Sequence, residues 1–468
     1  MQLWLEWFKC VFKLRKACSR TKTFIWMAFA LIGFSTLPDQ LGVTGLARAS
    51  FLKKKLYHNF LHLFHSTGLD LSKLTSLWVS LALKLFRPVS HNGRIVLLLD
   101  GLKIPKEGKR MPGVKKLHQS SSNNSKAPYI YGHSLQVLAL LVHSSLNLFY
   151  AIPLISRIHE GIVLSPLHKK SLPEKVHGLL ASILEDLSVK ILLIADAFYS
   201  NRKVILPLLE AGHHLLSRVR NNATAYEPAP KKTLRGRGRP KVYGKKVVLQ
   251  DLFNQMESFQ EAQVAVYGNG PVSVRFLTKD LLWKPVKRVV RFILVQHPER
   301  GRIILVTTDL EMDPSDAIRL YSARFKIEVS FKSAVHTVGA YVYRFWMKMW
   351  LPNKGRKGDQ YLHKKSKKYR EKTLAKIDSY HRFIQLAIIG QGLLLHLAIN
   401  FRKVVWSMFP SWLRTMKVNK APSELVVAHT LKFWYPEFLL GSNKAPAITK
   451  ILEDQIDVTQ IPGMTNAA

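Results

Sequence analysis

Three acidic residues stand where carboxylates could do chemistry. Asp100 directly follows the apolar run Arg94–Leu99, and Asp196 directly follows a second apolar run, Lys190–Ala195. Runs of this length predict buried strands, and ligand sites are usual at the carboxyl ends of strands in open α/β sheets. Glu328 is a lone acid among cations, in a segment whose apolar residues recur at helical spacing. Three carboxylates brought together by a fold can hold divalent metal ions.

Glu328 also has a purely structural explanation. Tyr321, Arg324 and Glu328 are spaced so that they share one side of a helix, and Lys332 follows one turn later. An ion pair of Glu328 with Arg324 or Lys332 on a solvated face would account for the acid equally simply. The two aspartates at the ends of buried-looking strands favour the metal-binding interpretation. Tyr321 could donate a hydrogen bond to a phosphate or pack as a half-buried core tyrosine.

The composition indicates a polyanionic partner. The chain has 468 residues, with 71 Lys and Arg against 30 Asp and Glu, which gives a formal net charge of +41. A charge of this size predicts binding to nucleic acid, with an anionic membrane surface as the second candidate. Hydrophobic residues make up 47% of the chain, enough for a sizeable core. A strongly basic protein with a cluster of carboxylates is expected to act on phosphodiesters.

Shifts in the hydrophobic pattern divide the chain. The first part has helical periodicity, the next alternates strands and helices, and a Pro-rich and basic stretch then opens a β-rich part. The predicted fold class is α/β, with an inserted β-subdomain and with helices before and after the core. The predicted domains are an N-terminal helical DNA-binding domain (1–90), the first part of the core (91–220), the β-rich insertion (221–305), the second part of the core with the Glu328 helix and a basic loop (306–400), and a C-terminal helical region (401–468).

Two segments have alternative interpretations. The piece Leu37–Phe51 has the length and turn chemistry of a helix-turn-helix, but it also fits a plain helical bundle. Residues 347–372 are dense in Lys and Arg and include Trp350, Tyr361 and Tyr369. This basic segment is either a solvated loop or a contact to the DNA backbone, in which the aromatic residues would take part.

The apolar runs do not predict a membrane protein. Phe24–Phe34 is shorter than the ~20 residues that a spanning helix needs. Phe383–Phe401 is interrupted by polar residues and predicts a buried helix of a soluble protein. The two cysteines, Cys10 and Cys18, lack the spacing of a zinc site and suit a reducing compartment. We therefore expect a cytoplasmic protein with no membrane partner.

The motifs and their order resemble those of a known family. The order is strand-Asp, strand-Asp, β-insertion, helix-Glu, with Tyr-x2-Arg-x3-Glu around Glu328. With these features the sequence resembles the DDE transposases of bacterial insertion sequences, in the group that has a β-strand insertion and a Tyr-Arg-Glu-Lys signature. Asp196-Ala-Phe-Tyr is similar to the second-aspartate motif of that group, and the segment from Asp100 to Lys109 to the first. The basic stretch from Gly238 to Gly244 is similar to one in the insertion of such proteins. The resemblance covers about residues 90–400.

The resemblance implies a fold, a cofactor and a reaction. The fold is a ribonuclease-H-like core, and the cofactor is two Mg²⁺ ions, for which Mn²⁺ could substitute. Asp100 would bridge both ions, Asp196 would bind one and Glu328 the other. The reaction is nicking of double-stranded DNA at the transposon ends and strand transfer to target DNA. The active complex is expected to be a homodimer, and the location the nucleoid of a bacterial cell.

Six further residues are predicted to contact DNA. Tyr321, Arg324 and Lys332 lie around the glutamate and would hold phosphates. The other three are Arg237, Arg239 and Lys241 in the insertion. Two arginines on an extended backbone can enter a narrow minor groove, although the same residues could form a basic β-turn.

One position departs from the signature. The lysine of the family is expected seven residues after the glutamate, where this chain has Val335, followed by His336. Lys332, one turn after Glu328, could take its place. This departure leaves an alternative function open, namely a catalytically inactive DNA-binding protein derived from a transposase.

Overall fold

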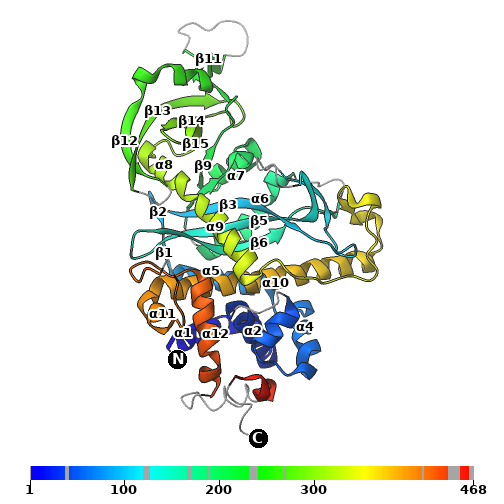
Figure 1. Cartoon of the computed structure of the whole chain (residues 1–468). Helices are drawn as coiled ribbons and strands as arrows, with labels where there is room; N and C mark the ends of the chain where they lie inside the picture. Colours follow the sequence, from blue (N-terminus) through cyan, green and yellow to red (C-terminus); the bar gives the residue numbers. More distant parts are fainter. Residues whose placement is uncertain are drawn as a thin grey trace.

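The molecule has three tiers (Figure 1): a β-rich end, a central sheet with helices on both faces, and a layer of helices that contains the first and last described helices. The computed structural model describes residues 2–36, 42–119, 127–165, 171–187, 189–230, 241–266, 270–413, 416–440 and 454–462.

Helices from both ends of the chain build the helical tier. Trp4 donates a hydrogen bond from Nε1 to the Leu431 carbonyl at 3.1 Å, so the first and last helices pack together. The N-terminal helices are α1 (Gln2–Phe12), α2 (Thr21–Ser35), α3 (Val43–Ala49), α4 (Tyr57–His65) and α5 (Leu71–Leu85), and the C-terminal ones are α10 (Lys367–Asn400), α11 (Arg402–Met408) and α12 (Glu424–Leu440).

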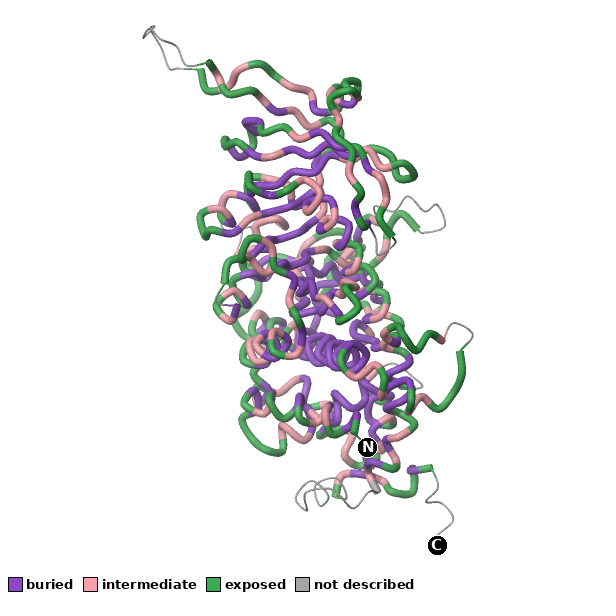
Figure 2. The backbone as a smooth tube through the Cα atoms, turned by 90° about the vertical axis from the view of Figure 1, so that its left-hand side faces the viewer, coloured by how far each residue is buried: buried purple, intermediate pink, exposed green. Residues whose placement is uncertain are grey.

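Helix α10 is the central element of this tier. It has 34 residues and begins at Lys367, well before the apolar run Phe383–Phe401 that predicted it. In the described part of the chain, it is the one helix long and apolar enough to cross a membrane, yet 94% of its most apolar 18-residue window is buried inside the protein. Figure 2 shows this helix end-on as a buried coil. Its apolar length therefore fits its role as a core helix.

Helix α3 bears on the predicted helix-turn-helix. In the described part of Leu37–Phe51 there is one helix of seven residues, and its Val43, Leu46 and Ala47 are buried. A Cβ atom at Gly33 would lie 2.8 Å from Leu46, so α2 and α3 pack closely against each other. This packing fits the helical bundle, while residues 37–41 of the segment lie outside the described residues.

The central sheet has the order β6-β5-β3-β8-β9. Strands β6, β5 and β3 are antiparallel, β8 is parallel to β3, and β9 is parallel to β8. This is the arrangement of a ribonuclease-H-like core, so the predicted fold is confirmed. The strands are β3 (Arg94–Pro105), β5 (Tyr129–His143), β6 (Phe149–Ile158), β8 (Ile191–Ala195) and β9 (His214–Arg218).

The inserted strands extend this same sheet. Strand β9 pairs antiparallel with β15, and pairing continues through β14, β13 and β10 to β11, which gives 14 strands in all. The inserted strands are β10 (Thr224–Pro228), β11 (Tyr243–Val248), β12 (Gln260–Ala265), β13 (Pro271–Trp283), β14 (Arg288–His297) and β15 (Gly301–Thr307), and the short strands elsewhere are β1 (Arg87–Pro88), β2 (Ser90–His91), β4 (Lys115–His118), β7 (Ile162–Val163) and β16 (Gln360–Tyr361). Strand β11 ends at Val248, because Leu249–Asn254 turns so that Leu249 and Phe253 are both buried.

The two faces of the sheet are covered by different helices. On β3, Leu97 and Leu99 pack in the core under α5, α6 (Leu172–Leu187), α7 (Arg202–Glu210) and α10. Val96 and Leu98 pack in a second core, which α8 (Pro314–Ala323) and α9 (Phe325–Ser333) help to form. Because side chains alternate along a strand, Asp100 continues the series of Val96 and Leu98. It therefore belongs to the α8–α9 face.

Candidate active site

The two aspartates occupy adjacent positions on neighbouring parallel strands. Leu99 of β3 is the partner of Ala195 of β8, so Asp100 and Asp196 are the next pair in register. Leu192 and Ile194 pack in the same core as Val96 and Leu98, which places Asp196 on the α8–α9 face as well.

Asp100 does not end its strand. Strand β3 continues to Pro105, because it stays paired with β5 up to Gly132. The prediction of a strand end at Leu99 and of a loop from Leu102 is therefore wrong, and the apolar run marks only the buried half of the strand. Asp196 does follow the end of β8, where its side chain accepts a hydrogen bond from the Phe198 amide at 3.0 Å.

Glu328 lies on a helix that is broken once. Asp313 caps α8 by accepting hydrogen bonds from two backbone amides, those of Ser315 and Asp316. Arg324 joins α8 to α9 with helical backbone angles, and a π-helical turn, Ala334–Val338, follows α9. The sequence predicts one helix from about Pro314 to Val335, and the structure divides it at Arg324.

Arg324 joins two of the carboxylates. Its Nη1 lies 2.9 Å from Oδ2 of Asp100, and its Nη2 lies 2.8 Å from Oε1 of Glu328. The guanidinium is planar and rigid, so Asp100 and Glu328 face one small group from two sides. The ion pair expected within the helix is thus present, and the same guanidinium also pairs with Asp100 of β3.

The carboxylates of the site shift one another's pKa values. Burial raises the pKa of Asp100 to about 6; Arg324 opposes this shift, and the charges of Asp196 and Glu328 add to it. Burial likewise raises the pKa of Asp196, against hydrogen bonding from the Phe198 amide and the charge of Arg324. Carboxylates that perturb each other in this way lie within one electrostatic site.

The donor chemistry of these residues suits Mg²⁺ or Mn²⁺, both of which take carboxylate oxygens. Asp100 and Asp196 supply such oxygens side by side. Among the residues that the structure describes, however, no three acidic, His or Cys side chains are gathered closely enough to hold an ion. Glu328 is turned toward Arg324 and its side chain is 44% exposed. In this structure Glu328 therefore lies apart from the two aspartates.

Comparison with known proteins assigns the family. Residues 13–270, more than half of the chain, match the family described as DDE superfamily endonuclease. The chain belongs to this family. The matched region of this DDE superfamily endonuclease includes Asp100 and Asp196 and ends before Glu328.

The other comparisons add little to the family match. A solved structure of a piggyBac transposase synaptic complex with hairpin DNA is similar to this endonuclease with a TM-score of 0.39 and 11% identity, over 97% of this chain and 82% of that chain. No curated protein matches the chain.

The other predicted site residues have different surroundings. Tyr321 is partly buried against the α8 core, and burial raises its pKa while Arg324 lowers it. Lys332 is exposed on α9, and Lys241 is exposed just before β11. Val335 lies in the π-helical turn and packs partly against the core, with His336 exposed beside it. Arg237 and Arg239 lie outside the described residues.

One residue of the site was not predicted. Tyr199 is buried, and a Cβ atom at Gly101 would lie 3.7 Å from its hydroxyl. Burial raises its pKa, and so do the charges of Asp100 and Asp196. Tyr199 thus supports the aspartates from behind. The Asp-Ala-Phe-Tyr motif holds this tyrosine, but only the fold shows which way it points.

Two of the three aromatic residues of the basic segment 347–372 are buried, whereas the sequence suggested that they could contact DNA. Trp350 and Tyr369 are buried and stack with ring centroids 6.1 Å apart. Together with Met347 and Leu362 they form a small core of their own. These two aromatic residues are therefore not available to DNA, whereas Tyr361 is exposed.

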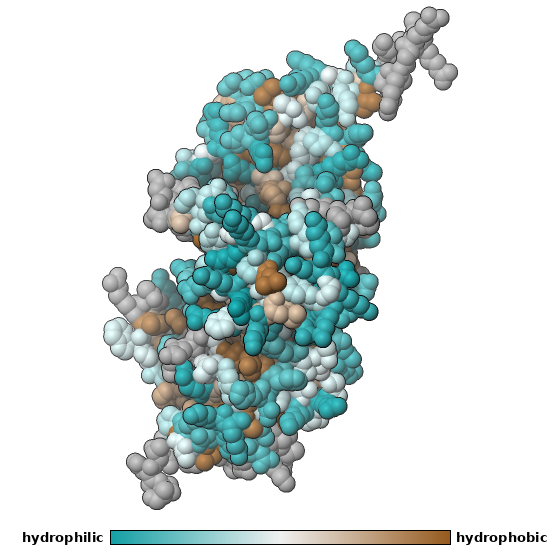
Figure 3. Space-filling model, turned by 90° about the vertical axis from the view of Figure 1, so that its right-hand side faces the viewer, coloured by the Kyte–Doolittle hydropathy of each residue, from teal (hydrophilic) through white to brown (hydrophobic). Residues whose placement is uncertain are grey.

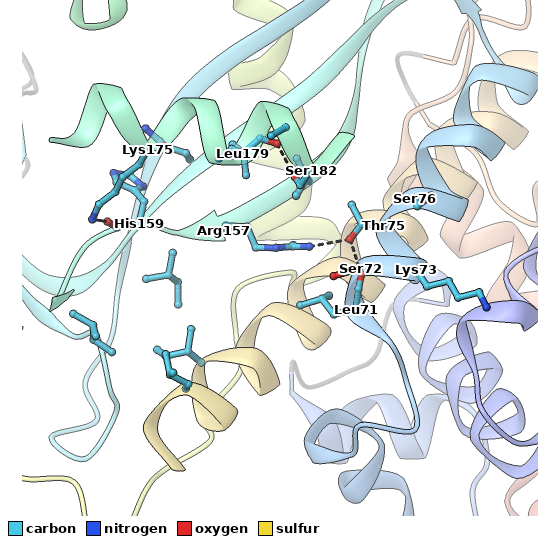
Figure 4. A pocket seen from close by; sticks show the side chains of 18 of the residues that line it. Leu71, Ser72, Lys73, Thr75, Ser76, Arg157, His159, Lys175, Leu179 and Ser182 are labelled. Carbon is cyan, nitrogen blue, oxygen red and sulfur yellow. Dashed lines mark hydrogen bonds between the residues drawn. The ribbon is translucent and has the colours of Figure 1, made fainter. Parts of the chain in front are cut away.

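A cavity of about 800 Å³ lies away from the carboxylates. It is lined by α5, α6, the end of β6 and α10, elements that cover the other face of the sheet (Figure 4). Arg157 extends across it and donates a hydrogen bond to the Thr75 hydroxyl at 2.8 Å. A DNA substrate needs an open surface rather than such a hollow, so this cavity is not the candidate active site.

Proposed function

We propose that this DDE superfamily endonuclease is a DNA transposase. It would cut phosphodiester bonds at the ends of a transposable element and join those ends to target DNA. The observation that carries the proposal is the placing of Asp100 and Asp196 side by side on the face covered by the Glu328 helix, with Asp100 and Glu328 sharing the Arg324 guanidinium.

Each residue of the site has a role in the proposed reaction. Asp100, Asp196 and Glu328 would hold two divalent ions, which when bound activate a water or 3′-hydroxyl and stabilise the leaving oxygen. Once freed from the carboxylates, Arg324 presents two parallel N–H donors, which match a phosphate. Lys332 lies exposed one turn beyond Glu328 and would hold a second phosphate in place of the signature lysine.

The partners follow from the charge and the reaction. The net charge of +41 suits double-stranded DNA, and the exposed cations of the basic segment 347–372 and Lys241 suit its backbone. Because two element ends must be joined, the active complex would be a homodimer. A cytoplasmic, nucleoid-associated location in a bacterial cell belongs to the same proposal.

The test compares a catalytic variant with a matched control. A plasmid carrying the sequences that flank the gene is incubated with the protein and Mg²⁺ or Mn²⁺, and nicking and strand transfer are measured. Glu328→Gln is expected to reduce both by about 100-fold or more while DNA binding is kept. The control, Glu210→Gln, removes the same charge from an exposed position at the end of α7 and should leave both unchanged. Cleavage retained by Glu328→Gln would remove that residue from the mechanism.

Val335 supports a second candidate, a DNA-binding protein that has lost catalysis. An apolar residue stands where the signature lysine is expected and packs partly against the core. This candidate predicts binding that weakens with salt and no metal-dependent nicking at any end sequence. The plasmid assay with the unmodified protein distinguishes the two functions.

A further inference from the structure

Two exposed tyrosines on the β4–β5 hairpin play no part in the proposed chemistry. Tyr129 is 50% exposed and Tyr131 is 37% exposed. They are two residues apart on β5, so their rings lie on one face of the strand. Single exposed aromatic residues are common, but two neighbouring rings on a strand offer a surface on which flat groups can stack.

Cations accompany both rings. Lys116 Nζ lies 4.2 Å from the centroid of the Tyr129 ring, and the Arg356 guanidinium carbon lies 4.3 Å from that of Tyr131. Lys116 comes from β4 and Arg356 from the basic segment 347–372, so two parts of the chain meet here. In Figure 1 the basic segment lies on the right-hand side of the molecule. Figure 3 shows that side, and hydrophilic residues cover most of it.

Arg356 is held in an unusual state. Its φ is 50°, in the left-handed region that non-glycine residues rarely adopt. Its Nη1 is buried and has no hydrogen-bond partner among the described residues. The Arg356 guanidinium, held beside the exposed ring of Tyr131, suits a ligand that carries both a flat apolar group and an anionic oxygen.

The hairpin lies on the same strand face as the carboxylates. Val137 is the cross-strand partner of Asp100, and Tyr131 lies six residues before Val137 on the same side of β5. That separation is about 20 Å along the strand. One strand of duplex DNA carries a phosphate about every 3.4 Å of helix axis, so at least about six nucleotides would connect the two places. His133 and Leu135 between them are buried, so the DNA would pass over the residues that cover them.

We propose that Tyr129 and Tyr131, with Lys116 and Arg356, form a stacking platform for unpaired bases of a DNA strand that extends from the active site. Stacking accepts any base, because every base has a flat π-face, and the two cations would neutralise the flanking phosphates. This inference rests on the proposed function, since it assumes DNA at the carboxylates.

The test measures binding without cleavage. The full-length protein, with EDTA present, is titrated into a blunt duplex and into a duplex of equal total length that carries a ten-nucleotide single-stranded extension. The extension contains 2-aminopurine, whose fluorescence falls on stacking. The variants are Tyr129→Ala/Tyr131→Ala and Tyr129→Phe/Tyr131→Phe. The control is Trp412→Ala, which removes an exposed ring from the helical tier.

The expected result is a preference for the extended DNA that depends on the rings. The double Ala variant should lose at least ten-fold in affinity for the extended DNA and change less than two-fold for the blunt duplex. The double Phe variant and Trp412→Ala should match the unmodified protein. Equal affinity of the unmodified and double Ala proteins for the extended DNA would overturn the platform, and so would an equal loss in the Phe variant, which keeps the rings.

The binding test of the platform and the cleavage test of the proposed function can give different answers. A ring-dependent preference together with no cleavage would support the platform and count against the transposase activity. Cleavage together with no preference would overturn the platform alone. Failure to bind either DNA would overturn both.

Discussion

At the scale of single residues, Arg324 determines how the carboxylates of the candidate site are paired. It pairs with Asp100 and with Glu328, and it lowers the pKa of Asp100 against the effect of burial. A guanidinium between two carboxylates offsets the repulsion that would otherwise oppose their approach. The same contacts occupy the oxygens that a divalent ion would need. In this conformation Arg324 would therefore compete with a bound metal ion.

Removing Arg324 should strengthen metal binding. In Arg324→Ala the carboxylates lose a competing cation, and we expect Mn²⁺ affinity to rise several-fold, on the scale of one ion pair near the surface. Electron paramagnetic resonance of free Mn²⁺ measures this without any cleavage. Lys326→Ala, which removes a neighbouring charge from the same helix, is the control. Weaker Mn²⁺ binding in Arg324→Ala would contradict the competition.

We expect His133 to contribute to a loss of stability in acid. It is fully buried, its Nδ1 lies 2.7 Å from the Tyr343 hydroxyl and its Nε2 lies 2.9 Å from the Pro112 carbonyl. Burial, and then the charge of Lys106, lowers its pKa from 6.5 to about 3. The unfolded chain therefore takes up this proton first as the pH falls. The free energy of unfolding should drop as the pH falls through 6.5 toward 3.

The expected loss by pH 4 is about 3 kcal/mol from this one residue. Urea unfolding at pH 7 and pH 4 measures it. His133→Gln, which does not titrate in this range, should reduce the loss by about this amount, whereas the exposed His58→Gln should leave it unchanged. Other buried histidines with lowered pKa values, such as His381 and His65, keep the remainder. An unchanged pH dependence in His133→Gln would show that other groups account for the acid sensitivity.

At the scale of elements, close helix packing positions the sheet. A Cβ atom at Gly392 of α10 would overlap the Trp78 ring of α5, and Trp78 in turn donates a hydrogen bond from Nε1 to the Pro153 carbonyl of β6 at 2.9 Å. Helix α10 can approach α5 only because residue 392 has no side chain. The contact joins the helical tier to the edge of the catalytic sheet.

Two glycine substitutions in helices should therefore have opposite effects. Gly392→Ala overpacks the α5–α10 contact and should lower the free energy of unfolding by about 1–3 kcal/mol. Gly178 of α6 has nothing within 4 Å of its Cβ position. Gly178→Ala should raise the free energy of unfolding by up to about 1 kcal/mol through helix propensity alone. Urea denaturation of both variants tests the packing, and a neutral Gly392→Ala would contradict it.

At the scale of the whole molecule, we expect the charge to govern the proposed binding to DNA. A net charge of +41 predicts affinity that falls steeply with salt, because each neutralised phosphate adds about 0.9 to the slope of log K against log salt. The basic segment 347–372 presents exposed lysines beside the β4–β5 hairpin, with which it is joined through Arg356.

Removing three of these lysines should reduce the salt slope. The triple substitution of Lys357, Lys364 and Lys368 by Ser is expected to lower the slope by about 3 if all three contact phosphates. Substituting Lys279, Lys284 and Lys287, which are exposed in the insertion, removes the same charge as a control. Fluorescence anisotropy from low to moderate salt gives both slopes. Equal reductions in the two variants would show that only net charge matters.

Local patterns in the sequence determined much of this protein. The apolar runs before Asp100 and Asp196 predicted neighbouring strands, and helical spacing placed Glu328 with Arg324 on one helix side. The family resemblance, now confirmed at the level of the DDE superfamily, added the ribonuclease-H-like core. These signals can be read from the sequence because buried residues alternate along strands and recur every three or four residues along helices.

The tertiary structure alone decided the rest. Strand β3 runs past Asp100 because β5 pairs with it, and Trp350 is buried because Tyr369 stacks on it. The insertion joins the catalytic sheet through β9 and β15, and Arg324 reaches Asp100 across the fold. Each of these is a contact between residues distant in sequence. A residue's own neighbours in the chain do not specify such partners, so no local pattern could predict them.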